Sequence, residues 1–290
     1  MIHYIVQILA FQLLFLVIYD VFLKKETFFN WNRAYLLITP ILSFVLPFIK
    51  INAIRETIPS EYIVTLPEIF LGDAVPESVL EQRALREVII SGVEIAPAAP
   101  WMTLLWLSGV VISTALFAYK IIKIQRLKRI GSSYQKDKIN IVTLSNTDTA
   151  FSFFNTIFLG ETLSEKQREN ILLHERIHIK EHHSFDMLFF EILRIVCWFN
   201  PLVYIYQNKM MMLQEYTADA KVVSQKDKKE YYQGLLSQVF QTESISFINP
   251  FFNHSIIKKR IVMLQKTKSK QILKAKYLFL IPALFSILVY

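Results

Sequence analysis

Two histidines and a glutamate, arranged as His174-Glu175-x-x-His178, have the spacing of a metal site. Residues four positions apart lie on one face of an α-helix, so both imidazoles can point at a single zinc ion. Glu175 stands beside them, where it can hold and deprotonate a water molecule at the metal. The pattern therefore predicts a zinc hydrolase site. A surface helix that carries two histidines by coincidence is the alternative.

A catalytic zinc site needs a third protein ligand, and Glu215 is our candidate. It follows His178 by 37 residues, in a second helical segment. Asp219 lies four residues further along, on the same helix face, so it can accept the ring N–H of a metal-bound histidine. A solvated acidic pair on an amphipathic helix is the alternative.

His182 is a weaker candidate for the third ligand. It lies on the face of the first two histidines, but three ligands along one straight helix spread over about 12 Å, too far to converge on one ion. The pattern HExxHxxGxxH also fails, because Glu181 and Ser184 replace its glycine and its third histidine. We interpret His182 and His183 as polar residues at the helix end.

The helix that carries the first two histidines has a clear start. Ser164 can cap it, and Gln167 three residues later completes a capping box. Apolar residues recur along the segment and are expected to bury one side of it: Ile171, Leu172, Ile177 and Ile179.

The composition is that of a membrane protein, since 53% of the 290 residues are hydrophobic and only 19% are charged. Three long apolar runs account for the excess, and we predict transmembrane helices over about residues 2–22, 34–51 and 101–122. The single cysteine excludes a disulfide framework and a multi-cysteine zinc ribbon. The six widely spaced glycines exclude phosphate-binding loops of the GxGxxG type.

Basic residues set the expected orientation. They follow the first and third runs and place those ends in the cytoplasm by the positive-inside rule: Lys24, Lys25, Arg33, Lys120, Lys123, Arg126, Lys128 and Arg129. The loop 52–100 is acidic, and we expect it and the N-terminus to be extracytoplasmic. The net charge of +8 then reflects juxtamembrane residues that face anionic lipid, and we expect no nucleic-acid partner.

The apolar segment 187–206 resembles a further span, but a full crossing would place Glu215 and His174 on opposite sides of the membrane. Asn200 and Pro201 also break the run. We therefore predict a helical hairpin that packs on the bundle or dips into the membrane and returns.

The C-terminal part contains amphipathic, basic and apolar segments. We predict an amphipathic helix over residues 227–241 and a lipid-facing basic segment that includes Lys258, Lys259 and Arg260. The last run, 277–290, reaches only about 21 Å as a helix. We expect it to begin a fourth transmembrane helix that continues beyond this sequence, with an interfacial helix as the alternative.

A family resemblance rests on three motifs, which are His174 to His178, Trp198-Phe-Asn-Pro-Leu202 and Glu215 to Asp219. With the apolar spans around them they resemble the M56 membrane metallopeptidases, the family of the BlaR1- and MecR1-type signal transducers, over nearly the whole chain. The resemblance implies a gluzincin-type zinc site with His174, His178 and Glu215 as ligands, Glu175 as general base and Asp219 behind a histidine. It also implies that an external signal switches proteolysis of the protein itself or of a regulator such as a transcriptional repressor. No serine acylation motif of the SxxK kind can be assigned together with its partner motifs, so a β-lactam signal is not supported.

An aromatic, strand-like segment precedes the capped helix: Phe151, Ser152, Phe153, Phe154 and Asn155. Peptidases of this type bind substrate as a strand added to a sheet edge, and the resemblance places this segment near the cleft. We predict that it forms the edge, with a buried hairpin strand as an equal alternative. An oxyanion donor could be Tyr204, Tyr206 or Tyr216, and the sequence does not select among them.

Together these features predict a mainly α, multi-span protein of the bacterial cell membrane. Three transmembrane helices occupy residues 1–123, a cytoplasmic gluzincin-like zinc peptidase domain with a small β element occupies 124–271, and a fourth span starts in 272–290. The predicted function is a Zn²⁺-dependent endopeptidase that acts on a protein or peptide in response to an extracytoplasmic signal. A non-catalytic transducer or scaffold that retains the fold, and a membrane zinc hydrolase with a non-peptide substrate, are the alternatives.

Overall fold

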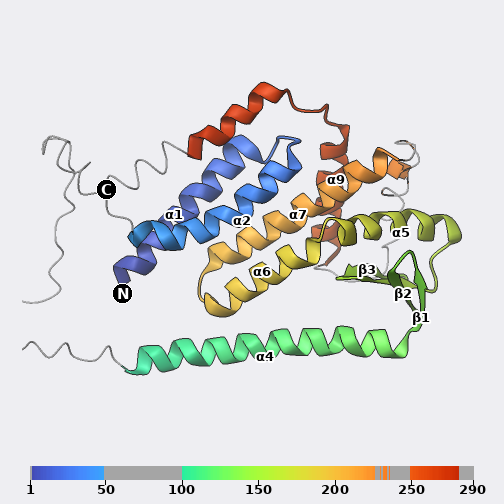
Figure 1. Ribbon diagram of the computed structural model, residues 1–290, viewed down its shortest axis with the longest axis horizontal. Coiled ribbons are helices and arrows are strands. Elements are labelled where there is room, and N and C mark those ends of the chain that lie inside the picture. Colours follow the sequence, from blue (N-terminus) through green and yellow to red (C-terminus); the bar gives the residue numbers. More distant parts are fainter. Residues whose placement is uncertain are drawn as a thin grey trace, which may run out of the picture.

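The computed structural model describes residues 2–48, 100–225, 229, 231–233, 235 and 249–280. Nearly all of the predicted loop 52–100, most of the predicted helix 227–241 and residues 281–290 of the last run lie outside these ranges. Within them the chain is mainly helical with one small sheet (Figure 1).

The N-terminal part is a pair of neighbouring helices. Helix α1 (Ile2–Ile18) runs into a π-helical turn, η1 (Tyr19–Leu23), and α2 (Phe29–Val45) ends in a 3₁₀ turn, η2 (Leu46–Phe48). The Tyr35 hydroxyl of α2 donates to the Phe15 carbonyl of α1 at 2.8 Å. Their shared apolar core extends to Phe190 and Tyr206, so the N-terminal pair packs directly on the central helices of the molecule.

Helix α7 (Pro201–Val223) is the central element, because α1, α2, α5 (Glu165–Lys180), α6 (His183–Val196) and α9 (Asn249–Gln265) all contact it. Asn200 caps α7 through a hydrogen bond from the Leu202 amide at 2.9 Å, and Pro201 occupies the first turn. A short turn joins α6 to α7, so the segment 187–206 folds back on itself within the molecule (Figure 1).

The long helix α4 (Pro100–Ile130) lies along α6 and leads into the sheet (Figure 1). At Gly109 the helix lies close against the turn that follows α6, since a β-carbon there would lie 2.1 Å from the Trp198 ring. The Trp106 indole N–H donates to the Val196 carbonyl at 3.0 Å, which ties α4 to the end of α6.

The sheet contains β1 (Ser132–Lys136), β2 (Ile139–Leu144), β3 (Ala150–Phe153) and β4 (Thr156–Gly160), in the order β1-β2-β4-β3. Strands β2 and β4 are parallel, and the other two pairings are antiparallel. One face packs on α5 through Ile141, Ile157 and Leu159. Strand β3 is an edge strand next to α5, in keeping with the predicted edge, although only residues 151–153 of the predicted segment 151–155 are extended.

The C-terminal segment returns to the N-terminal helices. After α9 the chain forms η6 (Gln271–Phe279), a 3₁₀ helix that contacts η1. The Lys276 ammonium lies 2.5 Å from the buried Glu26 carboxylate, and the Tyr277 hydroxyl donates to Asn32 at 2.8 Å.

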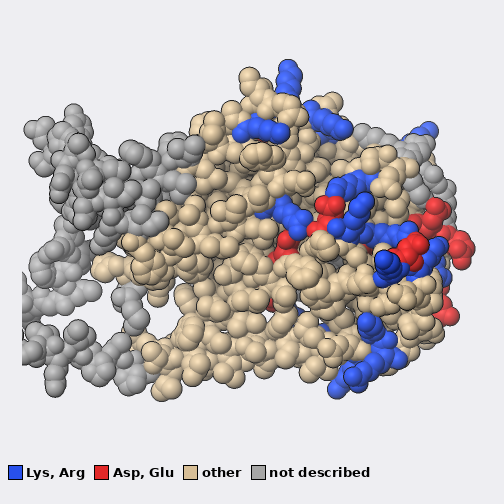
Figure 2. Space-filling view, viewed as in Figure 1, with Lys and Arg blue, Asp and Glu red and all other residues tan. Residues whose placement is uncertain are grey.

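Two helical segments are long and apolar enough to cross a membrane by length and composition, namely His3–Leu23 and Trp101–Ile130. Helix α2 has only 17 residues and contains Pro40, so the predicted three-span arrangement is not confirmed. Figure 2 shows charged side chains gathered towards one end of the molecule and near the C-terminal segment, whereas the surface over α1 and the first part of α4 is largely uncharged. Many large apolar side chains of α4 are exposed, including Leu104, Ile112 and Leu116.

Candidate metal centre

Two neighbouring helices, α5 and α7, carry the predicted ligands. The predicted capping box at the start of α5 is confirmed: Ser164 accepts from the Gln167 amide, and the Gln167 side chain accepts from the Ser164 amide. Ile177 of α5 packs with Ala218 and Val222 of α7 in one apolar cluster. This packing holds the histidine-bearing face of α5 against the Glu215 turn of α7.

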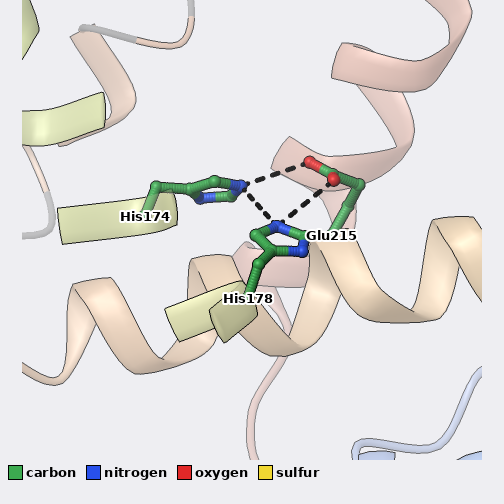
Figure 3. Close-up of side chains that lie close together, drawn as sticks. All are labelled: His174, His178 and Glu215. Atoms are coloured by element: carbon green, nitrogen blue, oxygen red, sulfur yellow. Dashed lines mark hydrogen bonds and ion pairs between the residues drawn. The ribbon is translucent and has the colours of Figure 1, made fainter. Parts of the chain in front are cut away.

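His174, His178 and Glu215 point towards one another (Figure 3). The two Nε2 atoms of the histidines are 3.1 Å apart. The Glu215 carboxylate lies 3.4 Å from Nε2 of His174 and 3.5 Å from Nε2 of His178. Among the described residues, this is the one group of histidine, cysteine or carboxylate side chains close enough to hold a metal ion.

The three ligand atoms suit tetrahedral zinc. Zinc lies about 2.0–2.2 Å from imidazole nitrogen and carboxylate oxygen, so neighbouring donors of a tetrahedron are roughly 3.3–3.5 Å apart. The two Nε2 atoms are 3.1 Å apart, and the Glu215 carboxylate approaches them with Oε2 at 3.4 Å from His174 and Oε1 at 3.5 Å from His178, which is close to that range. Two imidazoles and one carboxylate are also a known donor set for catalytic zinc, which keeps a fourth position for water or substrate.

Nδ1 of His174, its outer ring nitrogen because the metal-facing one is Nε2, contacts a carboxylate and a phenol. This nitrogen lies 3.3 Å from the fully buried Asp219 carboxylate and 3.0 Å from the Tyr231 hydroxyl, which itself donates to Asp219 at 2.7 Å. Burial alone would lower the pKa of His174, but hydrogen bonds to Asp219 and Glu215 outweigh it and raise the pKa to about 10. A metal ion at Nε2 would displace that proton, because histidine ligates as the neutral ring.

Arg260 of α9 neutralises both carboxylates of the site. It donates to the two oxygens of Asp219 at 2.8 and 2.6 Å, and its third nitrogen lies 3.1 Å from Glu215. Burial would raise the pKa of Glu215, but His174 and Arg260 lower it to about 2. The prediction that Arg260 belongs to a lipid-facing surface is therefore wrong, because its side chain points inwards and pairs with the carboxylates of Asp219 and Glu215.

The outer ring nitrogen of His178 faces His183, the first residue of α6. The two Nδ1 atoms are 2.9 Å apart, and His183 is only 3% exposed. Burial, followed by the nearby His178 and Arg33, lowers the pKa of His183 to about 3. His183 lies at a helix end as interpreted from the sequence, but it is buried, because the turn at His182 brings its ring against that of His178.

Glu175 contacts the edge strand. The Ser152 hydroxyl donates to its Oε2 at 2.6 Å, so the predicted general base is linked to the middle of β3. Phe151 points to the opposite face, where it stacks on Phe158. Phe154 and Asn155 form the turn that follows β3, and the left-handed φ of 48° at Phe154 ends the strand.

The other candidates named from the sequence have different partners. Glu181 pairs with Lys221, and the ring of His182 stacks edge-on against Phe185. The Tyr204 hydroxyl donates to the Trp198 carbonyl, and Tyr206 bonds Thr39 and Gln12 in the helix core. Tyr206 lies about 13 Å along α7 from the Glu215 turn, so neither Tyr204 nor Tyr206 is placed as an oxyanion donor. Tyr216 is buried next to Glu215 in the chain.

Sequence reasoning missed three residues that support the ligands: His183, Tyr231 and Arg260. For two of them a signal existed. His183 stands five residues after His178 beyond a helix end, and Arg260 stands among apolar residues in a helix-periodic segment. Tyr231 offered no spacing from which a contact with Asp219 could be inferred.

Comparison with known proteins gives a family match and several relatives. A family model described as BlaR1 peptidase M56 matches residues 3–264. The chain is 25% identical over 134 residues to the regulatory protein BlaR1 of Staphylococcus aureus. The aligned region covers 41% of this chain and 22% of that protein. It is 30% identical over 117 residues to the methicillin resistance mecR1 proteins of Staphylococcus aureus and Staphylococcus epidermidis, covering 37% of this chain and 20% of theirs. The matched region thus spans about a fifth of each relative.

Proposed function

We propose that this chain, which belongs to the BlaR1 peptidase M56 family, is a zinc-dependent endopeptidase embedded in the cell membrane. The observation that carries the proposal is the convergence of His174, His178 and Glu215 at separations suited to tetrahedral zinc. Family membership and this donor set support the same chemistry independently.

His174, His178 and Glu215 would hold the ion, and Asp219 would fix the tautomer of His174 from behind. Bound Zn²⁺ would supply a Lewis acid that polarises a peptide carbonyl. Arg260 compensates the charge of both acidic residues, so Glu215 stays ionised and available as a ligand.

Glu175 is the proposed general base. It follows His174 directly on α5, and the Ser152 hydroxyl fixes one of its carboxylate oxygens. The other oxygen takes the proton from the water that attacks the peptide carbonyl, and the carboxylic acid then delivers this proton to the leaving amine. Ser152 thereby couples the orientation of the base to the edge strand.

The substrate is proposed to bind as an extended strand along β3. Strand β3 is an edge of the sheet, and its middle residue contacts the general base, so a peptide added there would pass the metal. The turn at Phe154 and Asn155 limits the strand to Phe151, Ser152 and Phe153 at this end.

The proposed setting is a relay across the membrane. We place the N-terminus outside and the peptidase part in the cytoplasm, as the basic residues after the first and third apolar runs favour. The uncharged surface over α1 and the first part of α4 in Figure 2 suits contact with a bilayer. The substrate would be the chain itself or a cytoplasmic regulator, because relatives of this family carry the names of regulatory and resistance proteins.

The function is tested with Glu175→Gln in the full chain, expressed in bacterial membranes with cytoplasmic regulators. We expect the variant to retain zinc and to lose cleavage of the chain and of the regulators. Cleavage that continues unchanged would contradict the proposed enzyme. No cleavage in either protein, with signalling intact, would favour the non-catalytic transducer.

A further inference from the structure

The two metal-facing histidines have different partners behind them. Nδ1 of His174 faces the Asp219 carboxylate and the Tyr231 hydroxyl, whereas Nδ1 of His178 faces Nδ1 of His183 at 2.9 Å. The outer nitrogen of a metal-bound histidine usually donates to a carboxylate, a carbonyl or water. A buried imidazole in this place needs an explanation, because it carries no charge of its own to attract the proton.

Two facing ring nitrogens form a hydrogen bond only when one of them carries the proton. A histidine that gives its Nε2 lone pair to a metal is neutral and keeps its proton on Nδ1. His178 is then the donor, and Nδ1 of His183 is the acceptor. The proton of neutral His183 is accordingly on its Nε2.

The position of His183 is fixed by the backbone on one side and by α7 on the other. His182 adopts the left-handed conformation, with φ of 57°, and so turns the chain between α5 and α6. The His183 carbonyl accepts from the Gln214 amide group at 3.2 Å. Gln214 directly precedes Glu215, so the same turn of α7 holds both His183 and the carboxylate ligand.

A buried ion pair extends this contact to the N-terminal helices. The Gln214 side chain also donates to the Asp186 carboxylate at 2.9 Å. The Arg33 guanidinium of α2 contacts both oxygens of Asp186, at 3.0 and 2.9 Å. The Asp186 side chain is only 6% exposed. Hydrogen bonds therefore run without a break from α2, through Asp186, Gln214 and His183, to the metal-facing His178.

We propose that His183 is a positioning residue that sets the tautomer and ring orientation of His178, and that the Arg33–Asp186 pair holds it in place. The metal site is then completed only when α2 is docked on α6 and α7. The inference rests on the proposed zinc site, but it does not depend on peptidase activity.

Zinc affinity of the full chain in detergent tests the role of His183, measured by competition with a chromophoric chelator. His183→Leu should weaken zinc binding by about 10- to 100-fold, the usual effect of removing a partner behind a ligand. His183→Asn should stay within about threefold of the wild type, because its side-chain oxygen can accept where Nδ1 does. If both variants lose the same zinc affinity, the effect comes from packing. If His183→Leu loses no zinc affinity, His183 has no role in zinc binding. Either result overturns the proposal.

The role of α2 is tested with a matched pair of arginine variants. Arg33→Gln should weaken zinc binding by about tenfold. Arg194→Gln is the control, because Arg194 of α6 bonds Glu191 in the same helix and Gln207 of α7 without touching the residues that lead to His178. Equal zinc affinities of the two variants, with both proteins folded by thermal melting, would overturn the link to α2.

The experiment also separates this inference from the proposed function. A wild-type chain that binds no zinc would overturn the zinc site and this inference together. A wild-type chain that binds zinc no more tightly than His183→Leu would overturn only the role of His183.

Discussion

Arg260 of α9 holds both carboxylate oxygens of Asp219 on α7, at 2.8 and 2.6 Å. Asp219 is fully buried, and the Arg260 side chain is 12% exposed, so the pair is shielded from water. Because Asp219 supports His174, a helix far along the chain becomes part of the metal centre. Asp219 raises the pKa of His174 and Arg260 opposes that rise, while Arg260 also lowers the pKa of Glu215.

Arg260→Gln should therefore destabilise the fold and weaken metal binding. Breaking a buried pair leaves an uncompensated charge and costs about 3–5 kcal/mol. We expect a lower midpoint of chemical unfolding in detergent and a loss of zinc affinity of about tenfold. The neighbouring Lys259, which is exposed, provides the control Lys259→Gln. Equal stability of the two variants would contradict the assigned role of Arg260.

Zinc binding should strengthen as pH rises. Burial lowers the pKa of His174, but hydrogen bonds to Asp219 and Glu215 raise it to about 10 in the metal-free site. Below that pKa each bound zinc ion must displace one proton, so its Kd should fall about tenfold per pH unit between about pH 6 and 8. Competition titrations at several pH values measure the slope. Asp219→Asn should flatten it, and a slope that the substitution leaves unchanged would exclude His174 as the source of the proton.

Ser152→Ala should slow catalysis without loss of zinc. The Ser152 hydroxyl orients Glu175 through a 2.6 Å hydrogen bond. We expect kcat to fall about tenfold, a small part of the roughly 10²- to 10⁴-fold that a general base contributes. Ser133→Ala on the opposite edge strand is the control for cleavage rate and zinc content. Loss of zinc in Ser152→Ala would instead give the hydroxyl a structural role.

Gly109 of α4 lies against the ring of Trp198. We therefore expect Gly109→Ala to change stability in opposite directions with and without that ring. A β-carbon at Gly109 would lie 2.1 Å from the Trp198 ring, so Gly109→Ala should destabilise the protein by about 1–2 kcal/mol. In a Trp198→Ala background the same substitution should stabilise it by about 1 kcal/mol, the helix preference of alanine over glycine. Thermal unfolding in detergent measures all four proteins. Additive effects would mean that α4 does not pack against Trp198, in the turn between α6 and α7.

The metal-facing residues could be named from the sequence because helix periodicity alone brings His174 and His178 together. Glu215 lies on another helix, and family resemblance supported its choice. For Arg260 helix periodicity gives only a basic residue among apolar ones: its partner Asp219 is 41 residues distant, and the lysines next to it favour a membrane-facing surface. Only the packing of α9 on α7 shows which basic residue turns inwards.

Part of the fold could likewise be predicted from the sequence, and part could not. The mainly helical class follows from the long apolar runs and the small β element from the aromatic segment 151–155, and both are confirmed, as is the capping box at Ser164. The hairpin of β1 and β2 was not predicted, because its turn residues, Asp137 and Lys138, adopt positive φ without the usual asparagine-glycine or aspartate-glycine signal. The second predicted span is not confirmed: α2 has 17 residues with Pro40 inside it, and its contacts with α1 and α7 favour apolar residues as lipid does.

The metal centre is tested by X-ray absorption at the zinc edge of the purified full chain. We expect one zinc ion per chain, with two imidazole nitrogens and carboxylate oxygen at about 2.0–2.2 Å and no sulfur. Glu215→Ala should lose oxygen ligation and most of the zinc. A spectrum with one imidazole, with sulfur from Cys197, or with ligation unchanged in Glu215→Ala would contradict the site formed by His174, His178 and Glu215.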